Sequence, residues 1–218
     1  DMLVPAVAVL DPELTVSMPP HVTAATGMDA LTHAMEAYLS RKANPFTDPL
    51  ALAAIAAIAE HLPVAVAQPG DIRAREGMLL AQLQAGLAFS NASVGLVHSM
   101  SRPLGAFFGI PHGAANALLL PDVLEFMLPD CVERMGRMAV AMGVDVTGLD
   151  ERAAAKAAVG ATRSLFGQMG LPERLGPLGV TEDAIPAMAR DALASPSTPL
   201  CPAVPTQAEV EGLYRGLM

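Results

Sequence analysis

Cysteine is almost absent from this sequence, and tryptophan is missing altogether. The only two cysteines among 218 residues, Cys131 and Cys201, lie far apart and share no CxxC spacing. This excludes a cysteine-rich structural zinc site and gives no indication of a disulfide framework. A chain of this kind suits a reducing compartment, and we expect a cytoplasmic protein.

Positive charge is also scarce. The chain carries 13 Lys and Arg against 22 Asp and Glu, which gives a formal charge of −9. The basic residues that lie close together form only small groups, Arg41–Lys42 and Arg73 with Arg75. Because nucleic acid is bound through basic surfaces, we expect no nucleic-acid partner.

A hydrophobic run long enough to cross a membrane is lacking as well. The longest, "PLALAAIAAIAE" at residues 49–60, is too short for the hydrocarbon core of a bilayer. It ends in Glu60, and His61 and Pro63 follow. We therefore expect a buried helix here and no membrane partner.

What the chain does contain favours a packed helical protein. Hydrophobic residues make up 52% of it, charged residues 16% and aromatic residues 4%, and its thirteen methionines are suited to filling a core. Beyond the first residues we find no alternating pattern typical of strands. We predict an all-α, multi-helix domain with helices at about 24–40, 49–61, 72–89, 96–108, 112–127, 131–142, 151–169, 184–194 and 207–218.

The beginning of the chain differs from the rest. "LVPAVAVLDPEL", at residues 3–14, reads as a β-strand with nothing to pair with, and the first residue is Asp1 rather than Met. We expect the chain to be the C-terminal part of a longer protein. On this interpretation residues 1–15 are a connecting strand from an absent N-terminal domain, and residues 16–218 are the helical domain.

An acid and a histidine share one face of the first predicted helix. Asp29 and His33, in "TGMDALTHAMEAYLS", are four residues apart, so their side chains lie one above the other. Such a pair can bind a metal ion, or it can form an ordinary Asp–His hydrogen bond. The spacing alone does not decide between them.

Two further histidines lie in apolar helical settings. His98 occurs in "GLVHSMSR" and His112 in "IPHGAAN". Each alone is more typical of a hydrogen-bonded core histidine, but one carboxylate and three imidazoles together suit Fe(II) or Zn(II) with an exchangeable position. We interpret His21 and His61 as structural, His61 because it would end a helix.

Three longer stretches of the sequence resemble a known protein family. "MPPHVTAATGMDALTHAMEAYLS", "GLAFSNASVGLVHSMSRPLGAFFGIPHGAANALLLP" and the closing "CPAVPTQAEVEGLYRGLM" are similar, in the same order, to the iron-containing (group III) alcohol dehydrogenases. The resemblance covers essentially the whole chain. It implies a two-domain protein of which this chain matches only the C-terminal, helical metal-binding half.

The resemblance also implies a site. The metal ligands of the family fall on Asp29, His33, His98 and His112, with Fe(II) as the expected metal and zinc as an alternative. It implies NAD or NADP, bound mostly by the missing half, a small alcohol or aldehyde substrate, and a homo-oligomer in the full-length protein. Since the histidines must be neutral to bind, we expect metal affinity to fall below about pH 6.

One position departs from the family pattern. Many members have a second histidine four residues after the third ligand, whereas this chain has Arg102. Arginine stays protonated and cannot relay a proton, but its planar fork of donors can hold an anion. We assign Arg102 to the catalytic site, where it predicts an anionic substrate group; the alternative is a contact with an acidic residue or a partner domain.

The expected function is hydride transfer between an alcohol and NAD(P), with the metal polarising the substrate oxygen. Glu36 either orients a ligand or is solvated, and Asn91 is interpreted as the cap of the helix that leads to His98. For Asn116, one turn after His112, the sequence does not decide between a structural and a functional role. Two alternatives are a stand-alone metal-binding domain without redox activity, and an enzyme like glycerol dehydrogenase or dehydroquinate synthase. The fragment alone is expected to be inactive.

Overall fold

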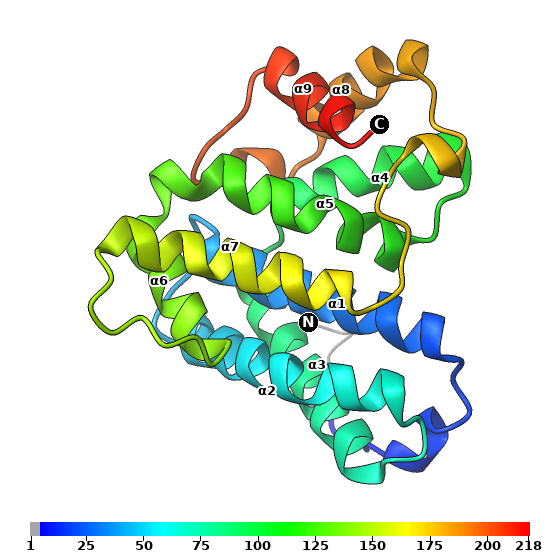
Figure 1. Cartoon of the computed structure of the whole chain (residues 1–218), viewed down its shortest axis with the longest axis vertical. Coiled ribbons are helices and arrows are strands. Elements are labelled where there is room, and N and C mark those ends of the chain that lie inside the picture. The colour runs from blue at the N-terminus through cyan, green and yellow to red at the C-terminus, as the bar shows by residue number, and fades with distance from the viewer. Residues whose placement is uncertain (1–4) are drawn as a thin grey trace.

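The computed structural model describes residues 5–218, and this part of the chain folds into α-helices joined by turns and short 3-10 helices (Figure 1). The all-α prediction is confirmed. The helices are α1 (Pro20–Leu39), α2 (Thr47–Ala67), α3 (Ile72–Ala92), α4 (Leu96–Phe108), α5 (His112–Met127), α6 (Val132–Ala141), α7 (Glu151–Gly167), α8 (Ile185–Ala194) and α9 (Gln207–Gly216).

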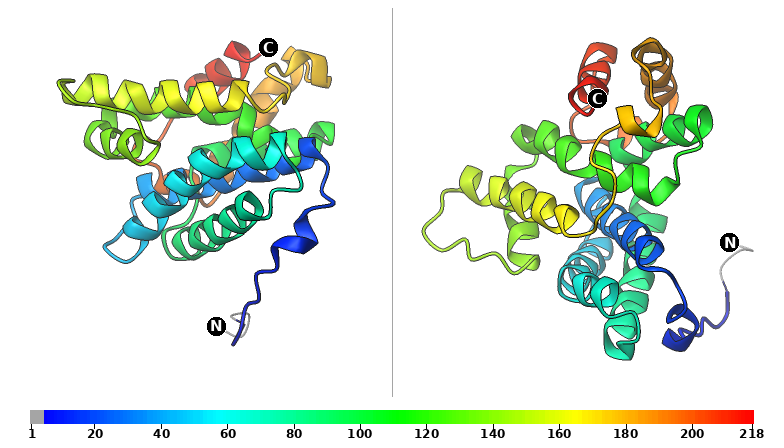
Figure 2. Two further views of the ribbon diagram at one scale, coloured as in Figure 1. Left: turned by 60° about the horizontal axis from the view of Figure 1, so that its bottom comes forward. Right: turned by 45° about the vertical axis from the view of Figure 1, so that its right-hand side comes forward.

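The predicted N-terminal strand is wrong for the residues described. Residues 5–11 form no strand, and Pro12–Thr15 form a 3-10 helix, η1. Residues 3 and 4 of the predicted strand lie outside the described part. The segment runs away from the helical body (Figure 2), and Val7 and Val9 are 78% and 85% exposed. Without a neighbouring strand, an extended segment has no ladder to join.

Helix α1 lies at the centre of the fold and contacts α2, α3, α5, α4 and α6. Pro20 occupies its first turn, where a missing N–H costs nothing, and the chain leaves the helix at Ser40 in an extended conformation. Ala24, Met28, Leu31 and Met35 are fully buried. Because α1 is enclosed on several sides, a polar residue on it meets protein rather than solvent.

Helix α2 continues past the end predicted for it. The helix runs through His61 and Pro63 to Ala67 because Leu62 and Ala65 remain buried beyond the expected break. Among the described residues it is the one helix long and apolar enough to cross a membrane. It packs on α1 and α3.

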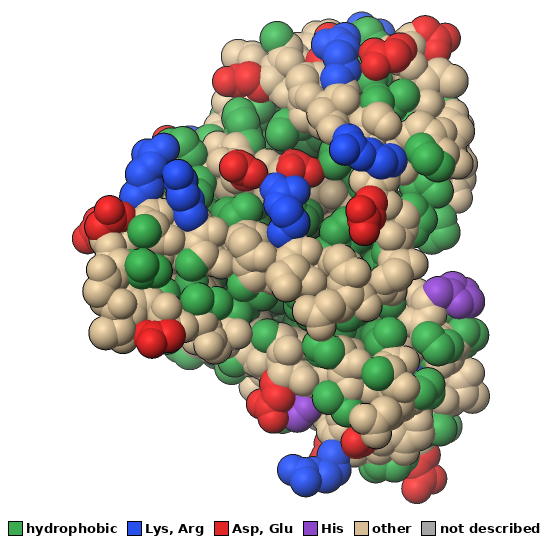
Figure 3. All heavy atoms as spheres, viewed as in Figure 1, with side chains coloured by type: hydrophobic (Ala, Val, Ile, Leu, Met, Phe, Trp, Pro, Cys, Tyr) green, Lys and Arg blue, Asp and Glu red, His purple; other side chains and the backbone are tan. Residues whose placement is uncertain are grey.

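The remaining helices form two outer groups. Helices α6 and α7 pack on each other, and α8 and α9 pack together beside α4 (Figure 1). On the face shown in Figure 3, basic side chains alternate with acidic ones. Arg163 on α7, for example, pairs with Asp122 and Glu125 on α5, at 3.0 Å each.

Candidate metal site

The four predicted metal ligands come from three helices. Asp29 and His33 are on α1, His98 is in the first turn of α4, and His112 is the first residue of α5. Gly113 permits this arrangement, since a Cβ at that position would lie 2.5 Å from the carbonyl oxygen of Ala25. The first turn of α5 therefore rests directly on the backbone of α1.

The donor atoms of these side chains converge. One donor atom each from Asp29, His33 and His98 lie within 4.8 Å of one another. The Nε2 atoms of His98 and His112 are 3.6 and 3.7 Å from Oδ1 of Asp29. Two donor atoms that each lie about 2 Å from one ion are at most about 4 Å apart, so the separations of 3.6 and 3.7 Å fit Fe(II) or Zn(II). The 4.8 Å is the upper bound for the group that includes His33.

Asn116, one turn after His112, marks the point of convergence. Its amide nitrogen is 2.6 Å from Oδ1 of Asp29, 3.2 Å from Nε2 of His98 and 3.0 Å from Nε2 of His112. One N–H₂ group thus lies within hydrogen-bonding distance of a carboxylate oxygen and two imidazole nitrogens, three atoms of the kind that can bind a cation. The amide oxygen of Asn116 is buried and has no hydrogen-bond partner within residues 5–218.

His33 is held by aromatic stacking rather than by hydrogen bonds. Its ring stacks on Phe89 of α3 at 4.4 Å and on His98 at 4.5 Å, and its Nδ1 is buried without a partner in the described part of the chain. Burial lowers the pKa of His33 to about 4, against the opposing charge of Asp29. The imidazole is therefore neutral at pH 7, the form that binds a metal.

The other two histidines differ in exposure. The side chain of His98 is 4% exposed and that of His112 is 49% exposed, so the site is closed on one side and open on the other. Burial also lowers the pKa of His112, with Asp29 opposing and His98 adding to the effect. The expectation that metal affinity falls below about pH 6 assumed an ordinary imidazole pKa. Because the pKa values of His33 and His112 are lowered, protons compete with a metal at these two residues only at lower pH.

Glu36 lies behind His98. Its carboxylate is buried, with Oε2 2.6 Å from Nδ1 of His98 and Oε1 accepting the N–H of Val97 at 2.6 Å. Of the two interpretations of Glu36, the structure therefore supports the orienting one over the solvated one.

Arg102 points toward a group of serines. Its guanidinium donates to Oγ of Ser195 at 2.5 Å and of Ser197 at 3.4 Å. It lines a cavity of about 310 Å³ together with Ser99 and Asp191, and within residues 5–218 it forms no ion pair. The acidic contact considered as its alternative role is therefore not found in the described part.

A separate cavity of about 230 Å³ adjoins the site on the α1 side. It is lined by Asp29, Thr23 and Thr26 of α1, by Met18 before it, and by Arg75 of α3, among others. Asp29 thus has one side toward the other predicted ligands and another toward a space that a small molecule can enter.

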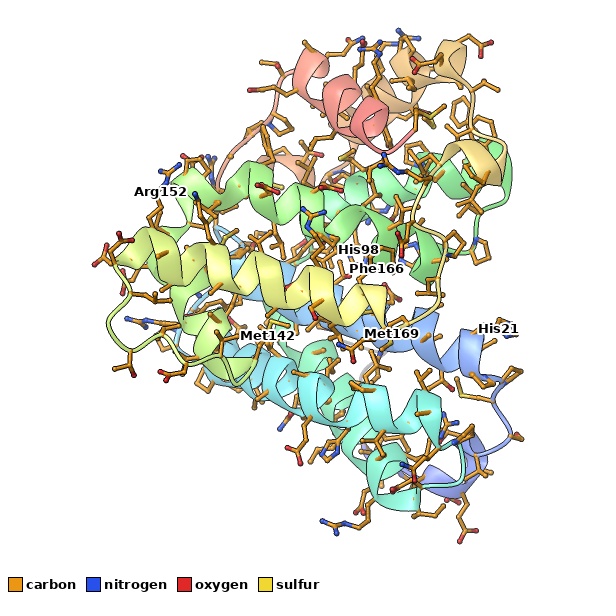
Figure 4. The ribbon with its side chains drawn as sticks, in the orientation of Figure 1. His21, His98, Met142, Arg152, Phe166 and Met169 are labelled. Atoms are coloured by element: carbon orange, nitrogen blue, oxygen red, sulfur yellow. The ribbon has the colours of Figure 1, made fainter. Side chains whose placement is uncertain are left out.

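The residues interpreted as structural lie away from this cluster. His21 is exposed near the start of α1, far from His98 (Figure 4). His61 does not end its helix as predicted but lies inside α2, where a Cβ on Gly77 would meet its ring at 2.1 Å. Asn91 does not cap α4, because α3 continues to Ala92 and the Asn91 amide donates to the carbonyl of Leu87.

Three comparisons with known proteins agree with one another. A model of the Fe-containing alcohol dehydrogenase family, C-terminal part, matches residues 23–218. The chain is 44% identical over 211 residues to 1,3-propanediol dehydrogenase of Klebsiella pneumoniae, covering 97% of this chain and 54% of that protein. It is 39% identical over 218 residues to NAD-dependent methanol dehydrogenase of Bacillus methanolicus, covering 100% of this chain and 57% of that protein.

The solved structures lead to the same group. The crystal structure of a 1,3-propanediol oxidoreductase superimposes with a TM-score of 0.94 at 43% identity, covering 95% of this chain and 55% of that one. The chain therefore spans about half the length of the relatives it matches.

Proposed function

The chain belongs to the Fe-containing alcohol dehydrogenase family, and from this premise we propose that it is the metal-binding part of an NAD(P)-linked alcohol dehydrogenase that also reduces aldehydes. The observation that carries the proposal is the convergence of Asp29, His98 and His112 on the amide nitrogen of Asn116, with His33 stacked beside them. Fe(II) is the proposed metal, and Zn(II) is the alternative.

A divalent metal ion in this donor set would act as a Lewis acid on the oxygen of a small alcohol or aldehyde. The residues of the chain prepare the site for it. Asp29 is the only charged residue among the four proposed ligands, so these ligands together with a divalent ion would keep a net positive charge. Burial keeps His33 neutral at pH 7, and the half-exposed His112 leaves one side open for the substrate.

Hydride exchange needs NAD or NADP as well, and we propose that a nucleotide-binding half outside this chain holds most of it. The relatives named above are about twice as long as the matched region, and one of them is called NAD-dependent. On this proposal the 218-residue chain binds metal but does not itself oxidise alcohols.

Metal binding by the purified chain tests the proposal. We expect about one equivalent of Fe(II) or Zn(II) after reconstitution, measured by elemental analysis, and its loss in His98→Ala because a tightly packed ligand is removed. His21→Ala is the matched control, since His21 is exposed and remote. Equal metal content in wild type and His98→Ala would contradict the proposed site.

Arg102 is proposed to hold an anionic group of the substrate. Arg102 is an exposed residue, its guanidinium donates to two serine hydroxyls, and its charge contributes to the lowered pKa of His112. In the zinc-loaded chain we expect Arg102→Gln to weaken binding of 3-hydroxypropanoate about tenfold while leaving 1,3-propanediol unchanged, since one charge-assisted hydrogen bond contributes about 1.5 kcal/mol. Calorimetric titration measures both ligands, and an equal loss for both would refute the anion role.

A further inference from the structure

We infer that Glu36 and Gly95 act together as positioning residues for His98. Neither belongs to the four proposed ligands, and neither lines the cavity beside Asp29 or the cavity at Arg102. The inference rests on the proposed metal site and extends it to the residues that decide how one ligand presents its nitrogen.

Glu36 joins two helices through both of its oxygens. Oε1 accepts the N–H of Val97, one of the backbone donors left free in the first turn of α4, and Oε2 accepts from Nδ1 of His98. The helix has no side-chain cap of its own, because its N-cap residue is Gly95. The carboxylate of α1 therefore caps α4 from outside, and its negative charge is favourable at a helix N-terminus.

The same contact selects the tautomer of His98. With Nδ1–H donated to Glu36, the lone pair of Nε2 faces the convergence point. On the opposite side of the ring, the Asn116 amide lies 3.2 Å from Nε2 and can donate only to an unprotonated nitrogen. Two neighbours thus require one tautomer, and it is the one that binds a cation through Nε2. Ligating histidines are commonly oriented by such a partner on the other ring nitrogen.

Gly95 leaves the room that Glu36 needs. A Cβ at position 95 would lie 3.0 Å from Oε1 and 3.3 Å from Cδ of Glu36, and 3.4 Å from Sγ of Cys201. The carboxylate cannot move away without lengthening one of its two 2.6 Å contacts. A side chain at position 95 would therefore disturb His98 without contacting any ligand.

Zinc binding to the metal-free 218-residue chain tests this inference, by competition with a chromogenic chelator and by the rise in Tm on adding Zn²⁺. The variants are Glu36→Gln, Gly95→Ala and the double variant, with Glu60→Gln on the exposed side of α2 as the matched control. We expect Glu36→Gln to weaken zinc binding about 10- to 100-fold, because the amide cannot satisfy both N–H groups. Gly95→Ala is also expected to weaken zinc binding. The fold loss of zinc affinity in the double variant is expected to be smaller than the product of the losses in the two single variants.

The Tm readout separates positioning from folding. A merely structural role would lower Tm equally in the metal-free and zinc-loaded states, whereas positioning reduces the rise that zinc produces. Wild-type zinc affinity in both single variants would overturn the inference and leave the proposed metal site standing. A wild-type chain that binds no zinc would overturn both.

Discussion

At the scale of single residues, burial decides which side chains of this molecule can react. His33 is kept neutral by burial, with a pKa lowered to about 4, and it therefore suits a metal at neutral pH. Burial also makes the two cysteine thiols less reactive. Burial raises the pKa of Cys131 to about 11 and that of Cys201 to about 12, where the nearby charge of Glu36 adds to the shift.

These thiol shifts predict slow alkylation. The thiolate is the reactive form, and a pKa raised above its ordinary value means that less of it is present at every pH below the new pKa. At about pH 8 we expect iodoacetamide to label the native chain at least about a hundredfold more slowly than the urea-unfolded chain, because an unperturbed thiol with pKa about 8.5 is already partly ionised there. Labelling followed by mass spectrometry measures both rates, and similar rates would show that the thiols are accessible.

The sequence pointed to the proposed ligands and to Glu36 as a residue that could orient one of them, but not to which ligand Glu36 contacts. Asp29 and His33 could be recognised because an i, i+4 pair is a local pattern, and the motifs that carry the family resemblance pointed to His98 and His112. No local pattern links Glu36 to His98, which lies 62 residues further on, or Arg102 to Ser195, 93 residues away. Phe89 was not predicted at the site because it reads as an ordinary apolar position of a helix.

At the scale of helices, apolar periodicity predicted nine helices and left their ends uncertain. Helix α2 passes through Pro63, and α3 continues through Asn91, where caps and breaks were expected. In both cases burial beyond the expected end, of Leu62 and Ala65 in α2 and of Ala92 in α3, outweighs the local signal. The expected strand failed for the opposite reason, since an extended segment without a partner strand gains nothing.

Close contact between α1 and α5 makes Gly113→Ala a sensitive test at this scale. Alanine is the better helix former, so any loss of stability reports the contact of its Cβ with the backbone of Ala25. We expect the free energy of unfolding to fall by about 1–3 kcal/mol, as for overpacked sites. The matched control is Gly160→Ala on α7, where a Cβ would meet nothing within 4 Å, and it should raise stability by about 0.5–1 kcal/mol.

Urea unfolding of the two variants supplies the comparison. A Gly113→Ala chain as stable as the Gly160→Ala chain would show that α5 can move away from α1 at little cost. Zinc affinity measured on the same samples would then report whether His112 had moved with it.

At the scale of the whole molecule, the proposed site joins parts of the chain that are distant in sequence. Its ligands span residues 29 to 112 on α1, α4 and α5, whereas α6 and α7 supply none of them. We expect added zinc to slow amide hydrogen exchange in α1, α4 and the first turn of α5, and to leave α6 and α7 nearly unchanged. Mass spectrometry of the exchanged peptides measures this pattern, and His98→Ala should abolish it. Uniform protection along the chain would contradict a localised site.

The unequal exposure of His98 and His112 sets a direction for exchange with solvent. Acid, chelators and competing ligands meet the His112 imidazole first, since its side chain is 49% exposed, whereas His33 is partly buried and the side chain of His98 is 4% exposed. Loss of a bound metal would accordingly be stepwise: His112 would dissociate from it first, and His98, whose ring is hydrogen-bonded to Glu36, would dissociate last. The same asymmetry gives protein engineers a practical division: exposed residues that are not proposed ligands, such as Arg102, can be varied for selectivity, whereas Glu36 and Gly95 behind His98 are best left unchanged.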